Sequence, residues 1–182
     1  KGRTLRPIVA LLERAGVRAS CLLGDDRSLV RELSGGRLRF LLLKPDDVPT
    51  YVEQGTAELG FVGRDVVLER EPDVFIPLDV GLGECRMVVA APRADVLARL
   101  AGARPLRVAT KYPNIATRHF LERGQFIETI FLQGSVEIAP ATGLADVVVD
   151  LVETGETLRQ NGLIEIETIH RVTSVVIANR VA

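Results

Sequence analysis

Short apolar runs alternate with amphipathic stretches along most of this 182-residue chain. The runs are rich in Val, Ile and Leu and have the length of single strands, whereas the stretches between them show helical spacing. This alternation is typical of strand–helix–strand crossovers, so the sequence predicts an α/β protein with mostly parallel sheets. Strands are expected at 38–43, 59–62, 74–78, 87–90, 106–109, 126–132, 147–152 and 164–169, and helices at 48–54, 65–69, 94–100, 115–122 and 157–160, after an amphipathic stretch at 5–14.

The composition is that of an ordinary globular protein, with 47% hydrophobic and 26% charged residues. The net charge of -1 gives the whole molecule no attraction to nucleic acid or to an anionic membrane. No apolar run approaches the length of a membrane span and no charged-then-apolar leader begins the chain, so a cytoplasmic location is expected. Cys21 and Cys85 indicate reduced thiols rather than a disulfide framework.

The stretch 147–158 joins a buried-strand pattern to a polar turn. Three consecutive valines lead into acids and then into Thr-Gly-Glu-Thr. Ligands of α/β proteins bind where such a strand ends. The hydroxyls of Thr154 and Thr157, the unhindered backbone at Gly155 and the free N–H groups of the next helix can converge on one phosphate. The stretch therefore predicts a site for a phosphorylated ribose.

Asp150, Glu153 and Glu156 repel a phosphate, so their expected role is different. Carboxylates accept hydrogen bonds from ribose hydroxyls, or they bind a magnesium ion that bridges the substrate. A purely structural alternative is that Thr154 caps a helix whose first turn favours Glu156 because of the helix dipole. The motif alone leaves both interpretations open.

Five segments of the chain stand out together: KGR at 1–3, DVPTYVEQGTAELGFVGRDVVLE at 47–69, GLGECRM at 81–87, ATKYPNIA at 109–116, and 137–158. In this order they resemble the catalytic subunit of ATP phosphoribosyltransferase, the enzyme that opens histidine biosynthesis. The resemblance implies a two-lobed fold like that of type II periplasmic binding proteins, with the active site in the cleft between the lobes. Lobe I would comprise 1–83 and 164–182, and lobe II would comprise 84–163.

The chemistry implied by the resemblance is attack by a ring nitrogen of ATP's adenine on the anomeric carbon of phosphoribosyl pyrophosphate. The nitrogen is neutral and has a free lone pair, so no general base is needed. The enzyme must align two anionic substrates and stabilise the charge on the leaving pyrophosphate. The residues implied as catalytic are Lys44, Arg86 and Arg27, and those implied as substrate-binding are Lys1, Arg3, Lys111, Glu137, Asp150, Glu153, Thr154, Gly155, Glu156, Thr157 and Leu158.

Several of these residues have a structural alternative. Lys1 and Arg3 are the end of a chain, which is commonly frayed. Arg86 could form a salt bridge across the hinge between the lobes. Lys44 stands where the family often has arginine, and lysine lacks the planar fork that binds phosphate through two hydrogen bonds. His119 and His170 fit no nucleophilic or metal constellation and are expected to be surface or packing residues.

The ligand spacing gives no protein-only magnesium cage, so Mg²⁺ is expected to arrive with phosphoribosyl pyrophosphate, and Asp150 is its expected protein contact. The chain length resembles the short form of the family. That form implies a regulatory subunit resembling histidyl-tRNA synthetase and a homodimer within a hetero-oligomer. Two alternatives stay open: a small-molecule binding or sensing domain of the same fold, and a phosphoribosyltransferase acting on a free nucleobase.

Overall fold

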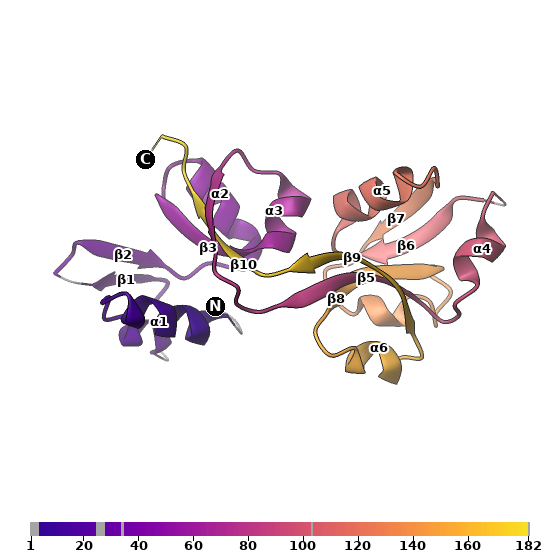
Figure 1. Ribbon diagram of the computed structural model, residues 1–182, viewed down its shortest axis with the longest axis horizontal. Coiled ribbons are helices and arrows are strands. Elements are labelled where there is room, and N and C mark those ends of the chain that lie inside the picture. Colours follow the sequence, from indigo (N-terminus) through magenta and orange to yellow (C-terminus); the bar gives the residue numbers. More distant parts are fainter. Residues whose placement is uncertain (1–3, 25–27, 34, 103, 182) are drawn as a thin grey trace. The chain divides into compact units, whose positions relative to one another are not determined.

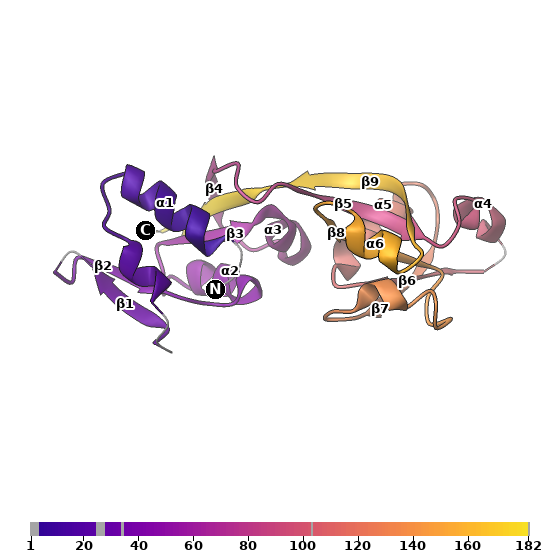
Figure 2. The same ribbon diagram turned by 90° about the horizontal axis from the view of Figure 1, so that it is seen from below.

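The computed structural model describes residues 4–24, 28–33, 35–102 and 104–181. The chain folds into two compact units (Figures 1 and 2). Neither unit is one continuous stretch of sequence. Unit 1 comprises Lys1–Val67, Glu71–Gly83 and Thr173–Ala182, and unit 2 comprises Leu68–Arg70 and Glu84–Val172.

Unit 1 is built on an antiparallel sheet with the strand order β3-β10-β4. The helices α2 and α3 lie against this sheet (Figure 1). Val62, Val175 and Ile177 of the sheet pack with Val52 of α2 and Val66 of α3. These elements are α2 (Val48–Glu53), β3 (Leu59–Gly63), α3 (Arg64–Arg70), β4 (Phe75–Asp79) and β10 (Ser174–Ala178).

A second, smaller core lies in the N-terminal part of unit 1. Val9 and Leu22 are buried there, and Leu33 and Phe40 of a β-hairpin pack against them. The hairpin pairs β1 with β2, Val30 lying opposite Leu41. The elements of this part are α1 (Leu5–Arg14), the 3-10 helix η1 (Ser20–Leu23), β1 (Val30–Leu33), β2 (Leu38–Leu41) and the 3-10 helix η2 (Pro45–Asp47).

Unit 2 contains a mixed sheet with the strand order β7-β6-β8-β5-β9. β6 is parallel to both β7 and β8, whereas β5 is antiparallel to both β8 and β9. Figure 2 shows β5 and β9 running side by side. The elements are β5 (Cys85–Ala91), α4 (Val96–Leu100), β6 (Leu106–Thr110), α5 (Pro113–Leu121), β7 (Ile127–Phe131), the 3-10 helix η3 (Val136–Ile138), β8 (Val147–Val152), α6 (Glu156–Gln160) and β9 (Ile164–Val172).

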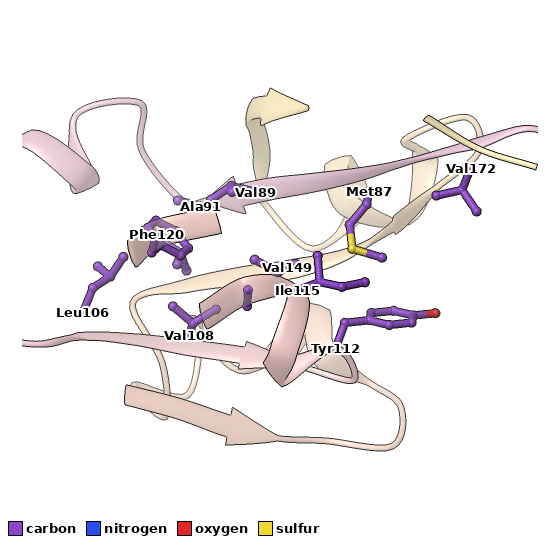
Figure 3. Packing of buried hydrophobic residues seen from close by; sticks show 12 residues of the cluster. Met87, Val89, Ala91, Leu106, Val108, Tyr112, Ile115, Phe120, Val149 and Val172 are labelled. Atoms are coloured by element: carbon purple, nitrogen blue, oxygen red, sulfur yellow. The ribbon is translucent and has the colours of Figure 1, made fainter. Parts of the chain in front are cut away.

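Both faces of this sheet are buried, because α5 and α6 lie on opposite sides of it (Figure 1). On the α5 side, Val149 packs with Phe120, and Tyr112 lies at the margin of the cluster with its hydroxyl directed away from the aliphatic side chains (Figure 3). On the α6 side, Val148 packs with Leu158. A strand covered on both faces needs a continuous apolar run, and this is why the valines of β8 stand in sequence.

The two units share one topological feature. In unit 2, α6 connects β8 to β9, and the antiparallel strand β5 lies between those two strands. In unit 1, α3 connects β3 to β4, and the antiparallel strand β10 lies between them. A helical crossover fixes the direction of the strands that it joins, but it does not require them to be neighbours.

This topology confirms the predicted α/β class and corrects two details. The sheet of unit 2 is mixed and that of unit 1 is antiparallel, rather than mostly parallel, because β5 and β10 each divide a crossover pair. The expected return to the first lobe at residue 164 is also too early, since Ile164–Val172 pairs with β5 in unit 2 and the chain returns to unit 1 at Thr173. The strand predictions omitted β1 and β10.

Candidate active site

The carboxyl ends of β6 and β8 lie at one edge of the sheet of unit 2, because these neighbouring strands are parallel. Lys111 follows β6 directly, and Asp150 lies near the end of β8. The charges of Lys111 and of Glu137 in η3 both act on the Asp150 carboxyl group. The structure therefore brings together three residues that the sequence had placed in the site.

Asp150 has an unusual environment for a carboxyl group. Burial raises its pKa to about 6. The Leu151 N–H donates to Asp150 Oδ1 at 2.8 Å and opposes this rise, whereas the negative charge of Glu137 adds to it and the positive charge of Lys111 opposes it. At neutral pH the group is ionised but poorly solvated, so a hydroxyl donor or a cation interacts with it strongly.

Thr110 joins the two strand ends through its side chain. Its hydroxyl donates to the Val149 carbonyl at 2.7 Å and accepts from the Tyr112 N–H at 2.8 Å. Thr110 and Val149 are fully buried, and Tyr112 is 5% exposed. The sequence analysis did not single out Thr110, because its contact with Val149 depends on how the strands pair.

The turn after β8 has a left-handed backbone conformation at its glycine. Gly155 has φ = 78° and is the N-cap residue of α6, and the Glu156 N–H donates to Thr154 Oγ1 at 3.4 Å. The side chains of Thr154 and Thr157 are exposed, as is that of Glu153. Leu158 differs from this group, since its side chain is buried in the core and leaves only its backbone available to a ligand.

Arg159 is a cation beside this turn that the sequence analysis did not select. Its guanidinium donates to Glu156 at 2.6 Å and to the Thr154 carbonyl at 3.5 Å. The hydrogen bonds from Arg159 and Gln160 hold the pKa of Glu156 below its usual range. The sequence contains one signal that could have identified Arg159. It follows Glu156 by three residues, a spacing that places the two opposite charges on one helix face.

The predicted catalytic cations are distributed between the two units. Arg86 of β5 donates two hydrogen bonds to Glu165 of β9, at 3.1 and 2.9 Å, so its ion pair lies within unit 2 rather than across a hinge. Lys44 belongs to unit 1 and is exposed at the start of η2. Lys1, Arg3 and Arg27 lie outside the described residues.

The two histidines have different surroundings. His119 is buried, and its Nε2 contacts the Glu167 carboxylate. Its Nδ1 lies 3.1 Å from Nη1 of Arg123, and because arginine can only donate, the imidazole must accept there. His170 is exposed and lies with His119 in the lining of a cavity of about 370 Å³ in unit 2. His119 is thus a satisfied packing residue.

Within residues 4–24, 28–33, 35–102 and 104–181, no three His, Cys, Asp or Glu side chains form a cluster that could hold a metal ion. The same part of the chain contains no helix that is long and apolar enough to cross a membrane.

Comparisons with known proteins place the chain among its relatives. The HisG family model, described as ATP phosphoribosyltransferase, matches residues 44–182. An ATP phosphoribosyltransferase of Sorangium cellulosum is 50% identical over 180 residues, which are 99% of this chain and 83% of that protein. In the ATP phosphoribosyl transferase (HisG:HisZ) complex from Thermotoga maritima, one chain aligns with a TM-score of 0.80 and 34% identity over 100% of this chain and 85% of that one.

A more distant likeness concerns the fold alone. The structure of Tv2483 bound to L-arginine aligns with a TM-score of 0.52 and 15% identity over 75% of this chain and 59% of that one. The fold and these relatives together define a phosphoribosyl-transferring α/β protein of the type II periplasmic-binding class, which confirms the fold class predicted from the sequence. The chain belongs to the ATP phosphoribosyltransferase family. A site between the lobes stays a prediction.

Proposed function

We propose that this chain condenses ATP with phosphoribosyl pyrophosphate to give phosphoribosyl-ATP and pyrophosphate, the first step of histidine biosynthesis. The observation that supports this best is the position of Asp150 and the Thr154–Thr157 turn. They lie at the carboxyl end of a strand, inside the segment that the family model matches. Neither alternative function, a binding domain or a nucleobase phosphoribosyltransferase, is favoured by an observation on the candidate site.

In this proposal the turn binds the 5′-phosphate. The hydroxyls of Thr154 and Thr157 are exposed, and the backbone N–H groups that open α6 are available to an anion. Arg159 supplies a positive charge beside them. The phosphate holds the ribose in place, which lowers the entropic part of the barrier to transfer.

Asp150 and Glu137 then meet the neutral part of the same substrate. Their carboxylates accept hydrogen bonds from the ribose hydroxyls, and Lys111 prevents the negative charge from accumulating. The attacking ring nitrogen needs no base, so these side chains orient the sugar and remove no proton from the nucleophile. Arg86 and Lys44 are proposed to bind the pyrophosphate or the triphosphate. For this role Arg86 must give up its hydrogen bonds to Glu165 and donate to the phosphate instead.

Magnesium dependence forms part of the proposal. A Mg²⁺ ion that arrives with substrate phosphates needs only one or two protein carboxylates. Asp150 fits this requirement, because its carboxylate is poorly solvated and the negative charge of Glu137 also acts on it. A cation bound there would offset both effects. The ion would neutralise charge on the leaving pyrophosphate.

The proposal is tested by turnover of the purified chain with ATP, phosphoribosyl pyrophosphate and Mg²⁺, with pyrophosphatase added and the product identified by mass. Phosphoribosyl-ATP is expected. If no product forms even after a regulatory subunit is added, the chain is a binding protein of this fold and the proposal is wrong. Replacing ATP by adenine separates the nucleobase alternative, which predicts product from the free base.

Gly155→Ala tests the role of the turn. Alanine at φ = 78° costs roughly 1 kcal/mol, and relief of this strain would turn the N–H groups away from the phosphate. We expect a higher KM for phosphoribosyl pyrophosphate. Gly134→Ala is the matched control, because Gly134 has an ordinary φ and open space around its Cα; equal KM values for the two variants would contradict the role of the turn.

A further inference from the structure

Thr110 occupies the point where the ladder between β6 and β8 ends. Thr110 and Val149 are the last residues of these two strands to pair. Beyond them the backbone of β6 leaves the sheet and turns into α5, so regular strand pairing no longer fixes its position. The Thr110 hydroxyl continues the connection past this point, since it bonds to Val149 on one strand and to Tyr112 in the turn.

The two residues bonded by this hydroxyl flank the charged groups of the candidate site. Val149 precedes Asp150, and Tyr112 follows Lys111. Three charged or titratable groups therefore meet here: Asp150 from β8, Lys111 from the turn after β6, and Glu137 from η3. Of these, Lys111 is on the segment whose backbone the hydroxyl restrains directly.

The chemistry at this position requires a hydroxyl. Thr110 is fully buried, and its hydroxyl has both its donor and its acceptor capacity in use. Valine has nearly the same shape and a similar preference for strands. It would, however, leave the buried Tyr112 N–H without an acceptor, which costs about 1 to 3 kcal/mol and favours movement of the turn.

We propose that Thr110 is a positioning residue of the active site, whose hydroxyl holds the Lys111 turn against β8 and so keeps the Lys111 ammonium close to the Asp150 carboxylate. The proposal rests on the function proposed above. Thr110 touches no substrate in it. Its effect reaches the ribose through Asp150 and Lys111.

The test compares Thr110→Val and Thr110→Ser with Thr129→Val. Thr129 lies in the neighbouring strand β7 and is half-buried, and its hydroxyl makes no hydrogen bond among the described residues, so it is a matched control. The first readout is the hydrogen exchange of the Tyr112 backbone N–H by NMR without substrate. Thr110→Val should speed this exchange about 10-fold, because the buried N–H loses its acceptor, while the other two variants exchange like the wild type.

The second readout is steady-state kinetics with phosphoribosyl pyrophosphate. Thr110→Val should lower kcat/KM about 10- to 100-fold, and Thr110→Ser should restore it. The inference is wrong if Thr110→Val and Thr129→Val agree in both readouts, or if serine fails to restore them. If Thr110→Val does not fold, Thr110→Ala takes its place with the same expectations. Hydrogen exchange needs no turnover, so an inactive wild type would refute the proposed reaction and still leave the effect of the Thr110 hydroxyl on the turn measurable.

Discussion

Asp150 combines a position suited to binding with an environment that is unfavourable for its charge. Burial and the negative charge of Glu137 both disfavour its ionised form. Position alone selected this residue from the sequence, because an acid after an apolar run falls at a strand end. Its poor solvation could not be predicted, since it depends on η3 and on the turn after β6, which the fold brings to the same edge of the sheet. The same limitation concealed Thr110, whose hydrogen-bond partner Val149 lies on a different strand.

Asp150→Asn should lower activity and raise stability at neutral pH. The pKa of Asp150 is near 3.8 in the unfolded chain and about 6 in the folded one. The folded protein therefore loses stability as pH rises through this window, by up to about 3 kcal/mol. Asparagine does not ionise and avoids this loss.

Urea denaturation of both proteins at pH 4 and pH 8 measures the effect. The advantage of Asp150→Asn should be larger at pH 8 than at pH 4. Asp95→Asn is the control, because Asp95 is the N-cap residue of α4 and pairs with Arg93 at the surface, and its pKa is lowered by the hydrogen bonds from Arg93. An advantage that does not depend on pH would contradict the assignment.

At the scale of elements, strands buried on both faces were the most predictable. β8 was predicted with the bounds that it has in the structure, because only Asp150 interrupts its apolar run. β1 was missed because Val-Arg-Glu-Leu contains two charged residues and resembles a loop. Strand neighbours were harder to predict than strands, because the antiparallel partners β5 and β10 come from distant parts of the chain and the periodicity of one strand does not specify the next.

The amino ends of β6 and β8 are held together by an ion-pair cluster. Asp146, just before β8, accepts hydrogen bonds from the Arg104 guanidinium at 2.8 Å and from the Arg107 backbone N–H at 2.9 Å. The hydrogen bonds from Arg104 and then those from Arg107 hold the pKa of Asp146 well below its usual range. The cluster therefore stabilises the sheet above pH 4, and this contribution is lost as pH falls.

Asp146→Ala should lower the free energy of unfolding by about 2 kcal/mol, as expected for hydrogen bonds to a charged group. Thermal unfolding at pH 7 measures the loss, and the difference from wild type should shrink towards pH 3. The Asp150 titration should be unchanged, because the cluster lies at the opposite ends of the strands. An unchanged melting temperature would show that the cluster contributes nothing to stability.

At the scale of the whole molecule, family membership predicts assembly as well as catalysis. The Thermotoga maritima relative was solved as a HisG:HisZ complex. We propose that this chain likewise binds a HisZ-type subunit. We further propose that this subunit is regulatory and resembles histidyl-tRNA synthetase, and that the chain forms a homodimer within the assembly. The cytoplasmic location predicted from the sequence stays a prediction.

Light scattering after size-exclusion chromatography tests the proposed assembly. The chain alone should elute as a dimer, and addition of a HisZ-type subunit should give one larger species of defined mass. Histidine should then inhibit turnover by that species. Separate elution of the two proteins at micromolar concentration would contradict the proposed partner.

The chain leaves unit 1, forms unit 2 and then returns to unit 1. This path determines the order in which the two units become able to fold during translation. β10 is the middle strand of the sheet in unit 1, yet the ribosome makes it after the whole of unit 2. Once β9 has emerged, every strand of unit 2 is present, whereas β3 and β4 still lack the strand that lies between them. Domains usually fold from the N-terminus onward during synthesis, and here the order should be reversed. Proteolysis of nascent chains stalled after β9 should therefore leave unit 2 protected and unit 1 cleaved, and protection of unit 1 should appear only once β10 has left the exit tunnel.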